Sequence, residues 1–498
     1  MSNRRYRAYL GERYRSLGGY AGVLFRLTGL LILAPAGLAL VFPDQGHMAL
    51  GFLWPGLSLT FIGTTLCLVF RPQQKNVLSI AEGSAIVVVA WGVAIIAGAV
   101  PFLWAGLDLT RAIFEATSGW TTTGLSVVDV SEISPLLLFF RSLMQLAGGA
   151  GLAILMLSTL AGPAGVGLST AEGRTEQLVP QVRQSARLVL KLYGVYILFG
   201  VAALRLAGLD WFDAVNHTFC AVSTGGFSTR IDSIGYWNNP AVEAVLIVLM
   251  LLGAMNFLTV YTLWRGHWRP VVHNGEVRVM AFLLPVATIL LFLGVTFQLY
   301  EETPGQIRAA IFQAVTALST TGYATVTFSD WNGLGQIIII ILMLVGGGTG
   351  STAGGIKQHR IYLLAKGVKK ELFKVFLSPQ TIQEEVLWVG SHRRFLLESD
   401  LRKTGLYIAL YLFTWLAGGC ALTAFGHPPA ASLFEFASAL GTVGLSVGIT
   451  GAATAAGQLW VEIAGMLLGR LEFFVIFWGI IKLGKDLSSV LPRGNVLD

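Results

Sequence analysis

The sequence predicts an all-α polytopic membrane protein, in which two extra transmembrane helices precede four span–pore-loop–span repeats around one pore. Three observations favour this fold class. Of the 498 residues, 54% are hydrophobic and 12% are charged, against about 25% charged in soluble domains. Several apolar runs exceed the length of about 18 residues that can cross a bilayer. A Thr-x-Gly motif recurs about every 100 residues, each time between two such runs.

The first two spans are expected at about 20–42 and 48–70. The first run is longer than the apolar part of a signal peptide and lacks a small-x-small cleavage site, so we interpret it as a membrane span. Five arginines precede or begin it: Arg4, Arg5, Arg7, Arg13 and Arg15. These features predict a multi-pass protein of the cytoplasmic (inner) membrane with its N-terminus in the cytoplasm.

Each later repeat consists of a span, a short apolar stretch, the Thr-x-Gly turn and a second span. The expected pairs of spans are 80–104 with 135–160, 186–207 with 240–264, 278–299 with 333–375, and 403–425 with 457–482. The chain therefore divides into an N-terminal extension (1–75) and repeats at 76–165, 166–268, 269–375 and 376–498. The second helix of the third repeat is expected to be broken, and the fourth repeat to begin with a charged cytoplasmic insert.

The distribution of charge supports this topology. With the N-terminus inside, the outward segments hold few of the 34 Lys and Arg residues, namely Arg111, Arg205, Arg230 and Arg308. The inward segments, above all 357–403, hold many of the others, which is the positive-inside pattern. The orientation of the chain in the lipid bilayer thus explains the net charge of +7, and no nucleic-acid partner is expected.

The apolar stretch before each turn is too short to cross the membrane. It begins near Phe114, Asn216, Phe312 or Phe434, about eight residues before the Thr of the turn. At ~1.5 Å per residue such a helix reaches only ~12–15 Å, about half of the hydrocarbon layer. Non-helical backbone at that depth is tolerated only inside protein or beside a water-filled cavity. The turns are therefore predicted to line a pore.

The turns contain oxygen atoms that could replace the hydration shell of a cation. The predicted ligands of K⁺ are Thr122, Thr123, Gly124, Thr224, Gly225, Gly226, Thr320, Thr321, Gly322, Thr442, Val443 and Gly444. Glycine tolerates φ > 0, which lets carbonyl groups point inward. The C-terminal ends of the half-helices add partial negative charge. No carboxylate lies in any of the four turns, which disfavours a Ca²⁺-type site.

The pattern resembles the Trk/Ktr/HKT superfamily of K⁺ uptake proteins, and most closely the bacterial TrkH-type subunit. The run Thr442-Val443-Gly444-Leu445-Ser446 is also close to the Thr-Val-Gly-Tyr-Gly loop of potassium channels. The resemblance covers nearly the whole chain and implies K⁺ uptake, with K⁺ as the bound, transported ion and no organic cofactor in this chain. It further implies a homodimer and a cytoplasmic TrkA-type nucleotide-binding regulatory subunit. Whether uptake is a symport with H⁺ or Na⁺, or passive, is left open.

A Gly-rich run interrupts the second span of the third repeat. Together with Arg470 it is the predicted gate: Gly346, Gly347, Gly348, Thr349, Gly350, Ser351, Thr352, Ala353, Gly354, Gly355 and Lys357. Each Gly costs a helix ~1 kcal/mol relative to Ala, and a helix broken at membrane depth must border a cavity. The resemblance implies that this loop blocks or opens the path below the turns. The alternatives are a flexible packing hinge, or a dinucleotide fingerprint, which is rejected because it needs a soluble strand–helix–strand unit.

Arg470 lies in the expected middle of the last span. A charge there costs ~2.5–3.5 kcal/mol on insertion scales, so Arg470 should face the bundle interior or water. It would either raise a barrier below the turns, hold the Gly-rich loop, or form a buried ion pair with another helix. Arg141 has a weaker claim to function, and Glu115 and Glu435 are interpreted as structural acceptors near the starts of the half-helices.

Other classes of protein are less well supported. No Ser-His-Asp set or phosphate-binding loop is found, and Cys67, Cys220 and Cys420 share no metal-ligand spacing, so the protein is not expected to be an enzyme. The cysteines are interpreted as small core residues. A Na⁺/K⁺-permeable HKT-like transporter would be favoured by Ser in place of a turn glycine. A broken-helix secondary transporter would require inverted repeats, whereas these four share one orientation.

Overall fold

The structure, a computed structural model, describes residues 3–70, 79–151, 182–376, 385–389 and 392–490. Apart from one two-stranded hairpin, the regular elements of these residues are helical. Six of the described helices are long and apolar enough to cross a membrane, or up to eight if each of two bent pairs forms one span. The predicted all-α membrane fold is therefore confirmed. The C-terminal part of the expected span at 135–160 and the expected boundary between repeats 1 and 2, at 165/166, lie outside the described residues.

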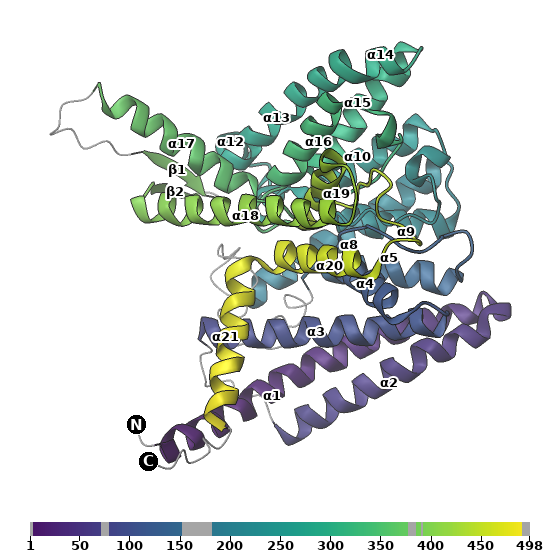
Figure 1. The fold of residues 1–498 in the computed structure, drawn as a ribbon, viewed down its shortest axis with the longest axis vertical. Coiled ribbons are helices and arrows are strands. Elements are labelled where there is room, and N and C mark those ends of the chain that lie inside the picture. The colour runs from purple at the N-terminus through teal and green to yellow at the C-terminus, as the bar shows by residue number, and fades with distance from the viewer. Residues whose placement is uncertain (1–2, 71–78, 152–181, 377–384, 390–391, 491–498) are drawn as a thin grey trace.

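Three long helices form one side of the molecule (Figure 1). They are α1 (Asn3–Leu33), α2 (Gly46–Val69) and α3 (Ile80–Trp104), with the 3₁₀ helices η1 (Ala34–Leu40) and η2 (Pro43–Gln45) between α1 and α2. Helix α1 thus begins well before the expected span at 20–42. Glycines allow α1 and α2 to approach closely: a Cβ added to Gly29 would lie 2.7 Å from the carbonyl oxygen of Gly56. Small residues at such crossings are typical of membrane helices.

The four repeats follow in the expected order. Repeat 1 contains α3, the pore helix α4 (Leu109–Trp120) and α5 (Pro135–Gly149). Repeat 2 contains α8 (Val182–Leu206), the pore helix α9 (Trp211–Val222), η3 (Ser233–Tyr236), α10 (Pro240–Ala254) and α11 (Phe257–Trp264), with α12 (Trp268–His273) next. Repeat 3 contains α13 (Gly275–Leu291), the π-helical η4 (Phe292–Thr296), α14 (Phe297–Leu299), the pore helix α15 (Thr303–Leu318), η5 (Phe328–Asp330), α16 (Gly333–Val345) and α17 (Gln358–Lys374). Repeat 4 contains α18 (Glu398–Ala424), the pore helix α19 (Pro429–Gly441), α20 (Ala456–Leu471) and α21 (Phe473–Val490).

Two of the second spans are sharply bent, which the sequence analysis missed. The helices α10 and α11 meet at 112°, and α20 and α21 meet at 101°, so the segments expected as spans at 240–264 and 457–482 are each broken by a sharp bend. In the first case the side chain of Asn256 caps α11 by accepting a hydrogen bond from Leu258 N. In the second, Glu472 adopts φ +59°, which ends α20. Arg470 therefore lies in the last turn of α20, and not in the middle of a continuous span.

The pore helices are longer than the sequence suggested. They contain between 12 and 16 residues, or ~18–24 Å of helix. Two of them start at an Asp that the sequence analysis overlooked: Asp108 caps α4 by accepting from Arg111 N, and Asp210 caps α9 by accepting from Asp213 N. These two helices therefore begin at Leu109 and Trp211, about one turn before the expected starts near Phe114 and Asn216.

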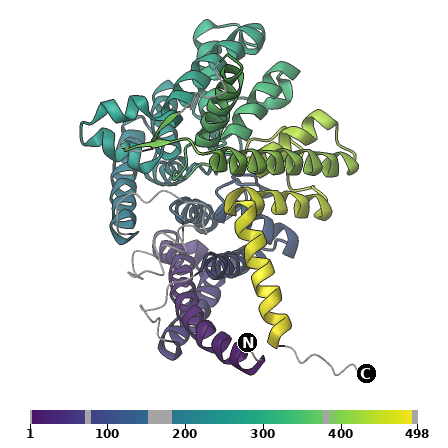
Figure 2. The ribbon, with the colours of Figure 1, turned by 90° about the vertical axis from the view of Figure 1, so that its left-hand side faces the viewer.

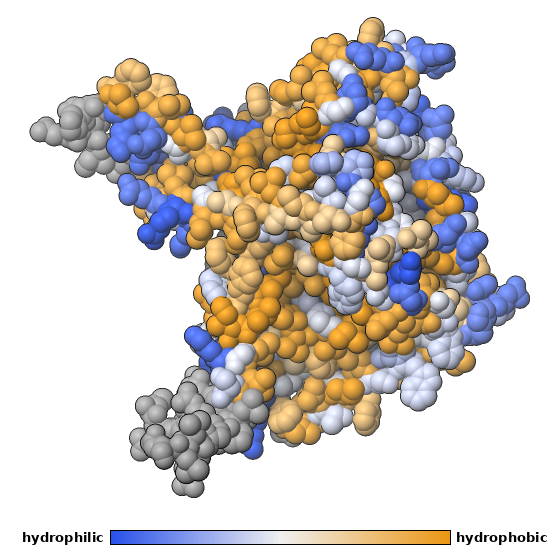
Figure 3. All heavy atoms as spheres, viewed as in Figure 1, coloured by the Kyte–Doolittle hydropathy of each residue, from blue (hydrophilic) through white to orange (hydrophobic). Residues whose placement is uncertain are grey.

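The surface matches a protein surrounded by lipid. Figure 3 shows apolar side chains along the sides of the helices and hydrophilic side chains gathered mainly at their two ends. The expected charged insert contains the hairpin, in which β1 (Val386–Val389) pairs antiparallel with β2 (His392–Phe395). Helix α21 leads back to the first helices (Figure 2), where Tyr14 Oη donates to Asp486 Oδ2 at 2.7 Å. Of the three cysteines, Cys220 is buried as expected, but Cys420 is exposed, so its interpretation as a core residue is wrong.

Candidate functional site

All four pore helices end in the same backbone conformation. The Thr after each helix has φ between +51° and +55°, and it donates its N–H to the carbonyl three residues earlier. The next residue, Thr123, Gly225, Thr321 or Val443, donates to the carbonyl five residues earlier at 2.8–3.0 Å. A β-branched residue with positive φ is strained, and glycine is usual at this position of a helix end. The same strain in four places indicates that the turns serve one purpose.

The four turns meet in a ring. We number them turn 1 (122–126), turn 2 (224–228), turn 3 (320–324) and turn 4 (442–446). A Cβ added to the glycine of each turn would overlap the carbonyl oxygen of the residue before the glycine in the next turn. These pairs are Gly124 with Gly225, Gly226 with Thr321, Gly322 with Val443, and Gly444 with Thr123. Turn 4 thus contacts turn 1, which closes the ring, and the predicted ligand residues are brought together around one axis.

A cavity of about 870 Å³ opens on one side of the ring, and all four turns line it with their glycines and the residues that follow. Asp129, Arg230 and Asp232 also lie along its wall. Hydrogen bonds from the Ser131 side chain and backbone lower the pKa of Asp129, which therefore carries a negative charge at neutral pH. This negative charge lies on the same cavity wall as the guanidinium group of Arg230.

The oxygen atoms of the ring differ in their hydrogen-bond partners. The buried hydroxyl groups of Thr122 and Thr442 have no hydrogen-bond partner within the described part of the chain. In turn 2, Gln145 Nε2 donates to the carbonyl oxygen of Gly225 at 2.6 Å, while Gln145 Oε1 accepts from Phe227 N at 3.1 Å. The predicted ligand Gly225 therefore already has one partner, and a carbonyl oxygen can accept a second. Gln145 was not singled out from the sequence.

One polar residue on each pore helix holds the chain that leaves the ring. It lies seven residues before the Thr of the turn, and the four residues are Glu115, His217, Gln313 and Glu435. Each bonds to a hydroxyl group beyond its own glycine, at 2.6–3.1 Å: Ser126, Ser228, Thr325 and Ser446 respectively. Glu115 and Glu435 are thus structural acceptors, as interpreted from the sequence. His217 and Gln313 were missed, although their shared position in the repeat could have revealed them.

The Gly-rich loop (346–357) lies directly against the other side of the ring. Thr352 Oγ1 is 3.0 Å from the hydroxyl oxygen of Thr224, and Gly354 N donates to Thr320 Oγ1 at 2.7 Å. A Cβ on Gly354 would overlap Thr442 Oγ1. The loop therefore contacts three of the four threonines that begin the turns. Its backbone also bonds to α10, because Thr352 N donates to Gly253 O at 3.1 Å.

Arg470 joins this loop to two other helices. Its guanidinium donates to the carbonyl oxygens of Thr352 at 2.6 Å and of Gly148, at the end of α5, at 2.5 Å. Glu472 pairs instead with Arg360 of α17 at 2.9 Å. A small cavity of about 50 Å³ lies here, lined by the loop, Lys357, Arg470 and Glu472 among others. Of the roles considered for Arg470, its position matches that of holding the Gly-rich loop.

Comparison with known proteins identifies relatives over nearly the whole length. The family described as TrkH, a cation transport protein, matches residues 56–486. The Trk system potassium uptake protein TrkH of Vibrio parahaemolyticus is 30% identical over 485 residues, covering 93% of this chain and 98% of that protein. The protein of the same name from Escherichia coli (strain K12) is 29% identical, covering 93% and 97%. The crystal structure of the potassium transporter TrkH from Vibrio parahaemolyticus superposes with a TM-score of 0.80 at 27% identity, covering 94% of this chain and 98% of that one.

Proposed function

The chain belongs to the TrkH family of cation transport proteins, and we propose that it carries K⁺ into the cell through the ring of four turns. The observation that carries the proposal is the closed ring of carbonyl groups at Thr123, Gly225, Thr321 and Val443. Such carbonyls replace the hydration shell of K⁺ without a side-chain charge that would trap the ion. The unpartnered hydroxyl groups of Thr122 and Thr442 supply further oxygen atoms.

The Gly-rich loop closes the path on the cytoplasmic side of the ring, and Arg470 holds it closed. Support for this part of the proposal comes from the hydrogen bonds that join Thr352 to Thr224, Gly354 to Thr320 and Arg470 to Thr352. A cation that leaves the ring would meet the loop first. Transport therefore requires the loop to move away from the threonines.

The protein works as a homodimer in the cytoplasmic membrane, with its N-terminus inside and with a TrkA-type nucleotide-binding subunit on its cytoplasmic face. The resemblance to the Trk/Ktr/HKT superfamily is the basis for the homodimer and for the TrkA-type subunit. The lysines of α17, which leads from the Gly-rich loop to the hairpin, favour a cytoplasmic position for this end: Lys366, Lys369, Lys370 and Lys374. A regulator bound here would act on the loop through α17.

Uptake of Rb⁺ by cells that lack their own K⁺ uptake systems tests the proposal. The wild-type chain should restore Rb⁺ uptake and growth at low K⁺, and K⁺ should compete with Rb⁺ far better than Na⁺ does. Absence of Rb⁺ uptake, with the protein present in the membrane, would refute the proposal. Equal competition by Na⁺ would instead assign the chain to the Na⁺-permeable HKT-like class.

A further inference from the structure

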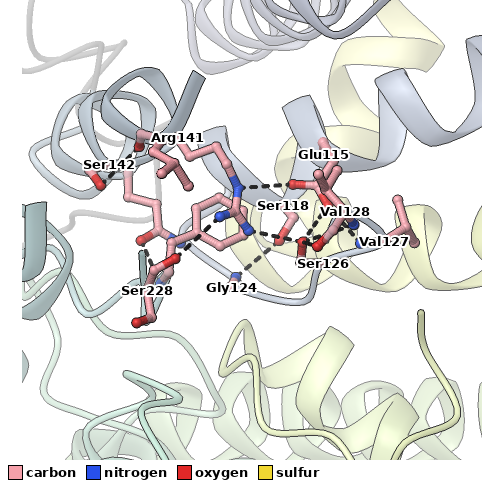
Figure 4. Close-up of polar contacts among 12 residues, drawn as sticks. Glu115, Ser118, Gly124, Ser126, Val127, Val128, Arg141, Ser142 and Ser228 are labelled. Carbon is pink, nitrogen blue, oxygen red and sulfur yellow. Dashed lines mark hydrogen bonds and ion pairs between the residues drawn. The ribbon is translucent and has the colours of Figure 1, made fainter. Parts of the chain in front are cut away.

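Arg141 of α5 is a buried cation beside the ring, and it takes no part in the function proposed above. Its side chain is 2% exposed, and that of its partner Glu115 on α4 is fully buried. Arg141 Nε donates to Glu115 Oε2 at 3.2 Å, and Nη2 donates to Ser126 Oγ at 2.9 Å (Figure 4). Glu115 also accepts from the N–H of Val127 at 2.6 Å. The pair therefore holds the chain that leaves turn 1.

The same side chain also reaches turn 2. Arg141 Nη1 donates to the carbonyl oxygen of Ser228 at 3.4 Å, and the guanidinium lies 3.9 Å from the centre of the Phe227 ring. Ser126 and Ser228 occupy equivalent positions, each two residues after the glycine of its turn. Arg141 thus joins matching points of two neighbouring turns, and it also lines the cavity next to the ring.

The other turns are supported differently. Glu435, the counterpart of Glu115 in turn 4, bonds to Ser446, Val447 and Thr450, and it forms no ion pair among the described residues. Gln313 of turn 3 is neutral. Arg230, which pairs with Asp213 near turn 2, has a side chain that is 38% exposed at the wall of the cavity. The bridge made by Arg141 is therefore a particular feature of turns 1 and 2.

Stability alone gives a weak reason for such a bridge. A buried ion pair stabilises a fold little more than apolar residues of the same volume, because both charges lose their hydration. The spacing of the turns, in contrast, decides how well the ring of oxygen atoms fits an ion. The guanidinium group of an arginine is a rigid, planar group with several N–H donors, so it can bond to two loops at once and fix them relative to each other.

We propose that Arg141 is a positioning residue for ion selectivity: it fixes turn 1 against turn 2, while Glu115 neutralises its charge. The inference rests on the proposed function, since it concerns the selectivity of the same ring. Loss of the bridge lets the first two turns shift relative to each other, so that the ring loses the fixed spacing that favours K⁺ over the smaller, more strongly hydrated Na⁺. Discrimination between K⁺ and Na⁺ should fall, while transport continues.

Two variants remove the bridge in different ways. Arg141→Lys keeps the charge, but a single ammonium group cannot reach Glu115, Ser126 and Ser228 together. The double variant Glu115→Gln with Arg141→Met removes both charges, so that no unpaired ion is left buried. Arg308→Met is the matched control, because Arg308 forms an ion pair with Glu243 between a pore helix and a second span, away from the cavity.

The measurement is the ratio of kcat/KM for K⁺ to that for Na⁺ in full-length protein, which does not depend on the amount of protein in the membrane. Both variants should lower this ratio about tenfold, the lower end of the loss in metal affinity or activity when partners of metal ligands are removed. Arg308→Met should leave it unchanged. An unchanged ratio in transporting Arg141→Lys or double-variant protein would overturn the inference alone. A wild-type chain that transports neither K⁺ nor Rb⁺ would overturn the proposed function instead.

Discussion

The guanidinium of Arg470 donates a hydrogen bond of 2.6 Å to the carbonyl oxygen of Thr352, and Thr352 Oγ1 lies 3.0 Å from the hydroxyl oxygen of Thr224. A single residue of the Gly-rich loop thus contacts both the ring and the end of α20. Because Arg470 also binds the carbonyl oxygen of Gly148, it links repeats 1, 3 and 4 below the turns. Movement of the loop has to break these bonds.

Replacing Arg470 with Gln should increase the basal flux of Rb⁺. A hydrogen bond from a charged donor contributes about 1.5–3 kcal/mol, so its loss should raise flux by about tenfold or more if the loop is the barrier. The measurement is Rb⁺ efflux from proteoliposomes without a regulatory subunit. Arg265→Gln, which changes an exposed arginine at the end of α11, is the control. Flux that stays the same or falls would show that Arg470 does not hold the loop closed.

Replacing Gly322 with Ala should weaken the selection of K⁺ over Na⁺. Gly322 has φ +86°, and an added Cβ would overlap the carbonyl oxygen of Val443 and lie 3.0 Å from the Cα of Gly444. Turns 3 and 4 would have to separate, and we expect about a tenfold loss of discrimination. Gly305→Ala is the matched control, because Gly305 lies in the same pore helix and has open space around it. Competition of K⁺ and Na⁺ with Rb⁺ uptake provides the measurement.

Replacing Gln145 with Leu should raise the KM for K⁺. The change leaves the carbonyl of Gly225 and the N–H of Phe227 without their partner, at a cost of about 1–3 kcal/mol per group. Turn 2 should then lose its fixed position, and KM should rise about tenfold with a smaller change in maximal rate. Gln145→Glu keeps the acceptor for Phe227 but loses the donor to Gly225, so its effect should be intermediate. Equal KM values in all three proteins would contradict this role.

The ion pair of Arg360 with Glu472 should stabilise the bend between α20 and α21. Arg360 Nη2 lies 2.9 Å from Glu472 Oε1, and its guanidinium is 3.7 Å from the centre of the Tyr407 ring. Arg360→Met and Glu472→Gln should each lower the free energy of unfolding by about 1–3 kcal/mol. The double variant should lose less free energy of unfolding than the two single variants lose together, since the two residues contact each other. Thermal unfolding in detergent tests this, and strict additivity would argue against the pair.

Much of the ring could be predicted from the sequence because its signals are local. The four turns were indicated by a Thr-x-Gly motif that follows an apolar stretch too short to cross the membrane. The broken helix was indicated by the run from Gly346 to Gly355. The bend at Asn256 was missed although its signal is local, since Asn256 caps α11 by accepting from Leu258 N. The bend at Glu472 was missed because Glu472 pairs with Arg360 of another helix. Gln145 was missed for the same reason: its partner Gly225 lies in the next repeat.

The sequence by itself indicated most of the membrane-spanning segments, the positions of the four turns and the break at 346–357, because hydrophobicity and backbone freedom belong to each segment alone. Only the tertiary structure decided that turn 4 closes on turn 1, that Thr352 lies against Thr224, and that Arg141 joins two turns. These contacts join residues as far apart as Thr123 and Gly444. They arise when helices pack, because buried polar groups must then find partners in whichever segment lies nearest.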